Sequence, residues 1–182
     1  MAEKEVMLHI ESLRKEYPGV IAVNDVSFDI YKGEVHIVIG ENGAGKSTLV
    51  KMLAGLNTID SGTLKLEGRE YKPENVLDAQ AKGVNIIHQE LSMMENRTVA
   101  QNIFIGREPV KGFWIDKKAM NEKCRELLDS LEIEIDPSTM VRDLSIAQQQ
   151  MVEVAKALSF QSKVLIMDEP TSSLTSKEID NL

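Results

Sequence analysis

The sequence has little of what a secreted or membrane-spanning protein needs. It contains a single cysteine, Cys124, so no disulfide can form within the chain. Its longest mainly apolar runs, residues 35–39 and 164–167, are far shorter than the roughly 18 to 20 residues that cross a bilayer. Residues 1–5 do not lead a basic segment into an apolar stretch, as a secretory leader would. We therefore expect a protein of the reducing cytosol, whose membrane contact goes through a partner.

The chain also lacks a surplus of basic residues. Lys and Arg number 21 against 29 Asp and Glu, which leaves a formal net charge of −8. Such a balance repels phosphate backbones and disfavours autonomous binding of nucleic acid. Hydrophobic residues nevertheless make up 42% of the 182 positions, enough to build the core of one ordinary domain.

Two kinds of strand are predicted. Alternating polarity, with a turn at residues 17–19, indicates a small antiparallel layer that is built from residues 7–13, 23–30 and 61–68. Short, mostly β-branched apolar runs are typical of strands that are buried on both faces of a parallel sheet. Such runs occur at residues 35–39, 84–87 and 164–167.

Apolar residues recur at helical spacing in two regions of the chain. Residues 46–54 show it and stop at Gly55, which gives the order strand, glycine-rich loop, helix. Further along, apolar residues recur on one helix face at Met120, Cys124, Leu127, Leu128 and Leu131. Cys124 is therefore predicted to be a core thiol.

The order of these elements predicts an α/β fold with a parallel core sheet. We expect a single domain over residues 1–182. Residues 1–89 and 163–182 would form its core and β layer, and residues 90–162 an inserted helical subdomain.

The glycine-rich loop matches the pattern G-x-x-x-x-G-K-[ST]. Its glycines allow backbone N–H groups to surround a phosphate chain, Lys46 would meet the β and γ phosphates, and Ser47 would ligate Mg²⁺. The alternative is a glycine-rich turn that only starts a helix. Because 39 residues precede the loop, a small-molecule kinase is disfavoured. The predicted nucleotide-binding residues here are Gly40, Glu41, Asn42, Gly43, Ala44, Gly45, Lys46, Ser47 and Thr48.

Two carboxylates end the last buried run. Parallel sheets present ligands at the carboxyl ends of their strands, so Asp168 suits the Mg²⁺ shell through water. Glu169 can polarise a water that attacks the γ-phosphate. The alternative is that the Asp-Glu-Pro sequence merely ends a strand.

Ser145 and Gln148 form the pattern of a capping box before a helix with an apolar stripe. One interpretation is an ordinary helix N-terminus. The other uses the same physics, because a helix N-terminus offers N–H groups and a positive dipole end to a phosphate.

In order and spacing, these motifs resemble the ATP-binding subunits of ABC transporters. Within that superfamily they resemble the first ATPase half of bacterial simple-sugar importers of the galactose/methyl-galactoside type. The resemblance covers the whole chain and rests on the glycine-rich loop, Gln89, and residues 106–112, 144–158 and 167–175.

The resemblance implies a P-loop NTPase (RecA-like) fold and further roles. Tyr17 would stack on adenine, and the alternative is that it is a turn aromatic. Gln89 would be catalytic, a metal ligand with Ser47 and Asp168, and a link to the membrane subunits. Ser145, with Gln148, would grip ATP that is bound by the opposite half.

Two departures from the family pattern stand out. Ile146 and Ala147 replace glycines that would allow close backbone approach to the second nucleotide. The family also expects a switch histidine beyond the Asp-Glu pair, and the sequence stops at Leu182, so we expect the hydrolytic site to be incomplete.

The sequence therefore predicts a module that uses ATP and Mg²⁺ to energise sugar import, peripheral to the cytoplasmic face of the membrane. Its expected partners are a second ATPase half, transmembrane permease subunits and, indirectly, a periplasmic or extracellular sugar-binding protein, with no nucleic acid. The alternatives are a chain that binds nucleotide without turnover and a soluble ABC ATPase that acts on nucleic acid or ribosomes.

Overall fold

A computed structural model describes residues 4–87, 93–160 and 162–167. The chain divides into two compact units, Met1–Asn85 and Ile86–Leu182. The predicted limits of the helical subdomain, residues 90–162, remain a prediction. Within the described residues, no helix is long and apolar enough to cross a membrane.

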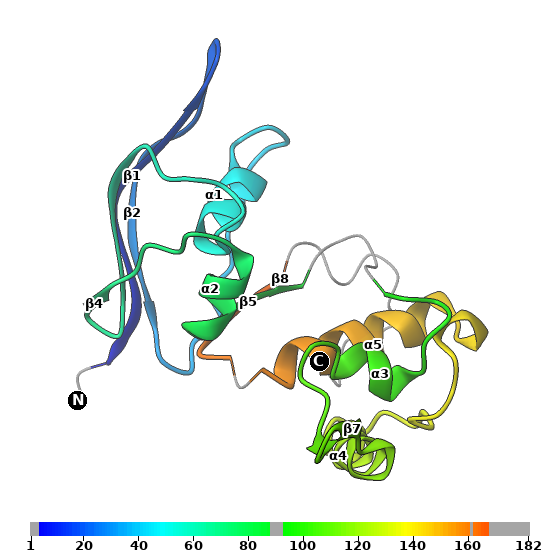
Figure 1. The fold of residues 1–182 in the computed structure, drawn as a ribbon. Helices are drawn as coiled ribbons and strands as arrows, with labels where there is room; N and C mark the ends of the chain where they lie inside the picture. Colours follow the sequence, from blue (N-terminus) through cyan, green and yellow to red (C-terminus); the bar gives the residue numbers. More distant parts are fainter. Residues whose placement is uncertain (1–3, 88–92, 161, 168–182) are drawn as a thin grey trace. The chain divides into compact units, whose positions relative to one another are not determined.

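The first unit is built on an antiparallel sheet of four strands in the order β2-β1-β3-β4 (Figure 1). Its strands are β1 (Val6–Tyr17), β2 (Val20–Tyr31), β3 (Ser61–Leu66) and β4 (Arg69–Glu70). β1 and β2 form a hairpin in which Tyr17 pairs with Val20. Pro18 and Gly19 make its turn, where Gly19 takes a φ of +83°. The predicted antiparallel layer is confirmed.

Two helices cover one face of this sheet, α1 (Lys46–Leu53) and α2 (Val76–Ala81) (Figure 1). α1 buries Leu49, Met52 and Leu53. The buried Tyr71 donates its hydroxyl hydrogen to the Leu53 carbonyl at 2.7 Å, and so satisfies an acceptor at the end of α1.

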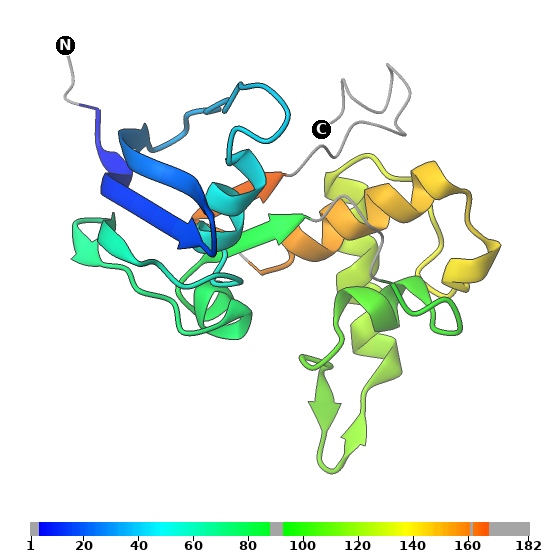
Figure 2. The ribbon, with the colours of Figure 1, turned by 90° about the horizontal axis from the view of Figure 1, so that it is seen from above.

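The parallel strands are only partly as predicted. β5 (Val84–Ile87) and β8 (Val164–Met167) pair in a two-stranded sheet and run in the same direction (Figure 2). The prediction of a buried strand at residues 35–39 is wrong. This segment is in no strand of the described structure, and Val35 and Ile39 are each 89% exposed. An apolar strand is buried on both faces only between hydrogen-bonded neighbours, and no described strand pairs with this segment.

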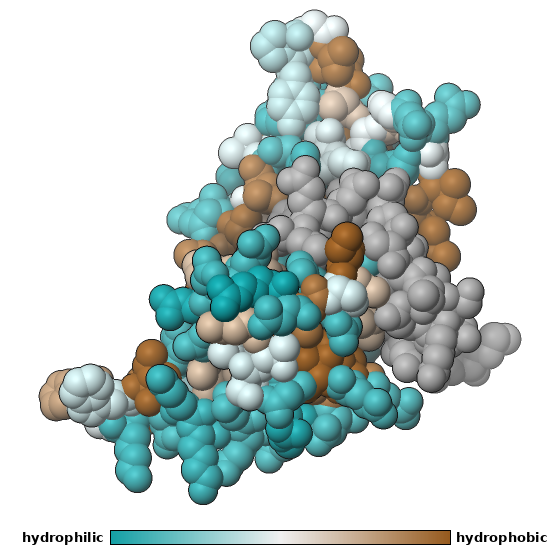
Figure 3. Space-filling view, turned by 90° about the vertical axis from the view of Figure 1, so that its right-hand side faces the viewer, coloured by the Kyte–Doolittle hydropathy of each residue, from teal (hydrophilic) through white to brown (hydrophobic). Residues whose placement is uncertain are grey.

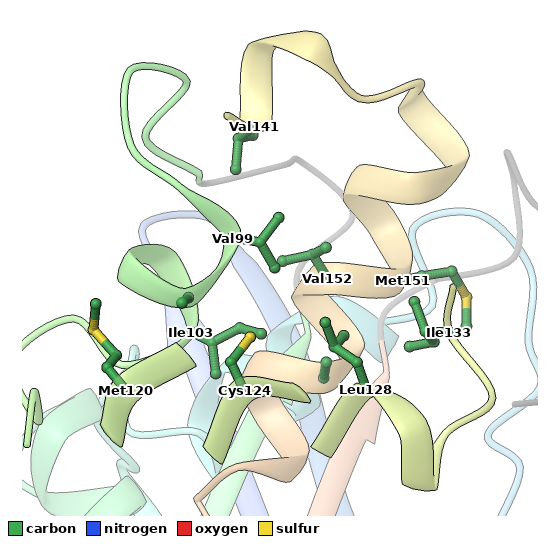
Figure 4. Close-up of a cluster of buried hydrophobic side chains, with 11 residues drawn as sticks. Val99, Ile103, Met120, Cys124, Leu128, Ile133, Val141, Met151 and Val152 are labelled. Carbon is green, nitrogen blue, oxygen red and sulfur yellow. The ribbon is translucent and has the colours of Figure 1, made fainter. Parts of the chain in front are cut away.

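The second unit contains α3 (Val99–Ile103), α4 (Lys117–Ser130), a short 3₁₀ helix (Val141–Asp143) and α5 (Ile146–Leu158). A small hairpin, β6 (Val110–Lys111) and β7 (Trp114–Ile115), precedes α4. α3, α4 and α5 pack around one hydrophobic cluster, which is shown in Figure 4. Its buried members are Val99, Ala100, Ile103, Met120, Cys124, Leu128, Ile133, Val141, Met151, Val152 and Ala155.

The predicted stripe of the long helix is confirmed. Met120, Cys124 and Leu128 are buried in the cluster, and Leu127 and Leu131 pack against its edge. Burial raises the pKa of the Cys124 thiol to about 12, because the charged thiolate would lose its hydration. Cys124 is thus a neutral core residue, as predicted.

Leu128 provides a test of this core. Leu128→Ala should lower the free energy of unfolding by about 3 kcal/mol, because it removes buried methyl groups and leaves a cavity. Ile146→Ala, at an apolar position that is 63% exposed in the same unit, is the control and should cost well under half of that. Urea denaturation followed by circular dichroism measures both. Equal losses in the two variants would show that this cluster is not the core of the unit.

Candidate nucleotide-binding site

The glycine-rich loop lies between residue 40 and the start of α1, and its shape depends on two glycines. Gly43 and Gly45 take φ angles of +83° and +87°, which strain any residue with a β-carbon. Gly45 has a second reason to be glycine. A β-carbon there would lie 2.0 Å from the backbone carbonyl oxygen of Ala22 in β2. The close approach of β2 therefore leaves no room for a side chain at the last residue of the loop.

The first turn of α1 differs from that of the other α-helices in the described part of the chain. In each of the other α-helices, the side chain of the N-cap residue accepts a hydrogen bond from a backbone N–H of the first turn. These N-cap residues are Asn75 in α2, Thr98 in α3, Asp116 in α4 and Ser145 in α5. The N-cap residue of α1 is Gly45, and no side chain caps this helix. Its first turn contains no acidic residue either. The positive end of α1 is therefore left for a ligand that can accept hydrogen bonds.

Lys46 folds back over the loop. Its Nζ donates to the carbonyl oxygens of Gly40 at 2.6 Å and Glu41 at 2.9 Å. An ammonium group has three donors, so these contacts leave one for a further acceptor. These two hydrogen bonds thus keep the Lys46 ammonium beside the uncapped end of α1 instead of extended into solvent.

These features fit a phosphate chain. The backbone at Gly43 is open to close approach, the N–H groups at the start of α1 have no side-chain cap, and Lys46 supplies a positive charge. The Ser47 hydroxyl is exposed at the same helix end, where an oxygen ligand of Mg²⁺ is expected.

An open cavity of about 640 Å³ adjoins the loop. Gly43, Ala44, Gly45 and Lys46 line one part of it, and β2 residues from Ile21 to Phe28 line another. His36 also borders it, stacked on Phe28 with ring centroids 5.0 Å apart. Sequence reasoning missed the role of Ala22 and its neighbours in β2. No local pattern could have identified them, because their contact with the loop joins segments more than 20 residues apart.

Tyr17 lies at the β1–β2 turn and is not among the residues that line this cavity. Its hydroxyl accepts a hydrogen bond from Asn57 Nδ2 at 2.9 Å. The ammonium of Lys15 lies 5.4 Å from the centre of its ring and is itself bonded to Asp60 Oδ1 at 2.7 Å. These contacts match a turn aromatic, and stacking of Tyr17 on adenine remains a prediction.

Ser145 and Gln148 form the predicted capping box at the start of α5. The Gln148 backbone N–H donates to Ser145 Oγ at 3.3 Å, and the Ser145 N–H donates to Gln148 Oε1 at 3.0 Å. The adjacent Ile146 is exposed. A contact of Ser145 or Gln148 with a second nucleotide remains a prediction.

Gln89, Asp168 and Glu169 lie outside the described residues. The strands that precede them in the sequence are described, because β5 ends at Ile87 and β8 ends at Met167. These two strands are paired neighbours. The catalytic and metal-binding roles of the three residues remain predictions.

Comparison with known families defines the class of protein. Residues 23–172 match the family described as ABC transporter, and the chain belongs to that family. Among solved structures, it superposes on an ATP-binding cassette of an ABC transporter in its ADP conformation. The TM-score is 0.82 at 26% identity, over 97% of this chain and 73% of the other. It also superposes on cbiO1 of Clostridium perfringens, part of the transporter complex cbiONQ. There the TM-score is 0.79 at 25% identity, over 97% of this chain and 70% of the other.

Curated relatives narrow the resemblance. The chain is 52% identical over 180 residues to a putative ribose/galactose/methyl galactoside import ATP-binding protein of Rhizobium johnstonii. It is 49% identical over 181 residues to the protein of the same description in Geobacillus kaustophilus. It is 47% identical over 182 residues to the ribose import ATP-binding protein RbsA 1 of Streptomyces avermitilis. These matches cover 98%, 98% and 100% of this chain but only 35%, 36% and 35% of the relatives, respectively. The predicted resemblance to sugar-importer ATPases and the P-loop fold are confirmed.

The contact between Gly45 and Ala22 can be tested by a matched pair of substitutions. Gly43→Ala and Gly45→Ala both place a β-carbon at positive φ, which costs about 1 kcal/mol. Only Gly45→Ala also meets a backbone atom, since no atom lies within 4 Å of a β-carbon at Gly43. We expect Gly45→Ala to lose markedly more affinity for a fluorescent ATP analogue and more thermal stability. Equal effects would show that the Ala22 carbonyl does not hold the loop.

Proposed function

We propose that this chain is an ATP-binding and ATP-hydrolysing module that energises the import of a simple sugar through an ABC transporter. The observation that carries this proposal is the uncapped start of α1 behind a loop of positive-φ glycines, with Lys46 fixed beside it. The relatives named for ribose, galactose or methyl galactoside import supply the substrate class. The chain spans about a third of their length, so the activity of a whole transporter subunit is part of the proposal.

Binding would use fixed groups of the first unit. The backbone N–H groups of the loop and of the first turn of α1 would surround the phosphates, and the Lys46 ammonium would contact the β and γ phosphates. Ser47, with Asp168 and Gln89, would hold Mg²⁺, which neutralises phosphate charge when bound. Tyr17 would contribute adenine stacking once Lys15 moves from its ring.

Hydrolysis would depend on residues that follow the paired strands. Glu169, directly beyond β8, would accept a proton from the attacking water and orient it in line with the γ-phosphate. Gln89 would position the same water and carry the state of the site to the membrane subunits.

The partners follow from this role. A second ATPase half would present its own loop to Ser145 and Gln148, which form the capping box at the start of α5. Transmembrane permease subunits would hold the pair at the cytoplasmic face of the membrane, and a sugar-binding protein would act on the other side. The net charge of −8 supports a partner set without nucleic acid.

Lys46→Ala tests nucleotide binding. Removing the ammonium takes away a charge-assisted contact with the phosphates, so Mg-ATP affinity should fall by at least about tenfold. Lys51→Ala, which removes an exposed lysine from the same helix, is the control and should bind like the parent. Titration with a fluorescent ATP analogue measures both variants. Unchanged affinity in Lys46→Ala would refute the assignment of the loop.

Glu169→Gln tests turnover in an assembled, full-length transporter. The amide keeps the shape of the side chain but cannot accept the proton, so the variant should bind ATP normally and lose most of its hydrolysis. Glu126→Gln, on the exposed face of α4, is the control for the loss of one carboxylate. Phosphate release and nucleotide binding are measured side by side. Near-parental turnover in Glu169→Gln would move the catalytic base elsewhere, whereas a parent without turnover would leave a module that only binds nucleotide.

A further inference from the structure

The β6–β7 hairpin presents apolar side chains that none of the described residues of its unit covers. Phe113, at the tip, is fully exposed, and Trp114 is 81% exposed. Val110 and Ile115, paired opposite each other, are exposed as well. The hairpin extends away from the helices of its unit in Figure 2. In Figure 3 it is the projection at the lower left, beyond the hydrophilic surface.

The fold of the hairpin does not depend on these side chains. Two strand pairings and a bond from the Asp116 backbone N–H to the Pro109 carbonyl at 2.8 Å close it. Gly112 takes the positive φ, +66°, that a tight hairpin turn requires. The hydrophobic cluster of the unit includes none of the exposed apolar residues of the hairpin. Exposed apolar side chains that gather in this way mark interaction surfaces.

Basic residues surround this apolar tip. Lys111 lies opposite Trp114 in the hairpin, and Lys117 and Lys118 begin α4 directly after it. Cations at a helix N-terminus oppose the helix dipole, so helix stability does not explain the two lysines of α4. Residues 110–118 contain three lysines and one acidic residue, Asp116, in a chain of net charge −8.

The acidic groups near the lysines leave them accessible. The Asp116 carboxylate accepts a hydrogen bond from the Ala119 backbone N–H at 3.0 Å, as the cap of α4. Lys118 and Glu122 are 3.8 Å apart, and the Lys118 side chain is 87% exposed. Glu108 precedes the hairpin in the sequence. An exposed ion pair such as Lys118–Glu122 is weak, so Lys118 remains available to another partner.

We propose that this hairpin is a membrane contact, in which Phe113 and Trp114 enter the interface of an anionic phospholipid bilayer while the lysines face the lipid phosphates. The indole of Trp114 has a polar N–H edge and favours the headgroup region, and the ring of Phe113 adds apolar surface. Lysines near an anionic surface are attracted to it. A narrow, convex tip suits a bilayer better than a protein, because a stable protein interface buries about 800 Å² on each partner. This direct contact goes beyond the partner-mediated attachment expected from the sequence.

Trp114 makes the proposal easy to test, because it is the only tryptophan of the chain. The 182-residue protein is mixed with vesicles of phosphatidylcholine alone or of equal parts phosphatidylcholine and phosphatidylglycerol. We expect a blue shift of tryptophan fluorescence and co-sedimentation with the anionic vesicles only. Phe113→Ser, and separately the triple change Lys111→Gln, Lys117→Gln and Lys118→Gln, should each lower the vesicle-bound fraction by about tenfold.

Three controls make the outcomes decisive. Leu77→Ser removes an exposed apolar side chain from α2 and should bind vesicles like the parent. Lys46→Ala should also bind vesicles normally, so failure here and failure of the proposed function are distinguishable. Circular dichroism checks that each variant folds. No binding to anionic vesicles, equal binding to neutral ones, or parental binding by Phe113→Ser would overturn the proposal. A Phe113→Ser defect confined to assembly of the full-length transporter would also overturn it, in favour of a protein partner.

Discussion

One backbone contact, between Gly45 and the carbonyl of Ala22, sets the position of the candidate site. It joins the last residue of the loop to strand β2 at a distance that no β-carbon allows. Because Gly45 is also the N-cap of α1, the same contact fixes where that helix begins. Burial of Leu49, Met52 and Leu53 then fixes its direction against the sheet. The antiparallel sheet thus limits where the loop and the start of α1 can lie.

The structure gives up local stability where a ligand can restore it. A side-chain cap contributes about 1 kcal/mol to a helix, and α1 is the described α-helix without one. A phosphate at this end would satisfy the N–H groups and the helix dipole that a cap would otherwise satisfy. Lys117 and Lys118, at the start of α4, likewise oppose the helix dipole, and they lie next to exposed aromatic side chains. Such departures from local preference tend to mark binding surfaces.

The sequence predicts local structure well here and long-range contacts poorly. Alternation and helical spacing gave the antiparallel layer, the stripe of α4 and the loop before α1, because these patterns depend on neighbours in the chain. The segment at residues 35–39 has the composition of a buried strand, yet its state depends on pairing partners that composition does not specify. The Ala22 contact and the cation above the Tyr17 ring were likewise invisible, since each joins positions set by the fold.

The exposed segment at residues 35–39 explains why Lys46 has two roles, one toward the phosphates and one in holding the loop. It leads directly into Gly40, so the first residues of the loop follow a stretch without a hydrogen-bonded strand beside it in the described structure. The bonds from Lys46 to the Gly40 and Glu41 carbonyls tie that end of the loop back to α1, while Gly45 ties the other end to β2. The Lys46 ammonium, which would contact the phosphates, therefore also stabilises the loop that would surround them. Loss of Lys46 would remove a charge and loosen the loop together, whereas loss of Lys51 would remove a charge alone.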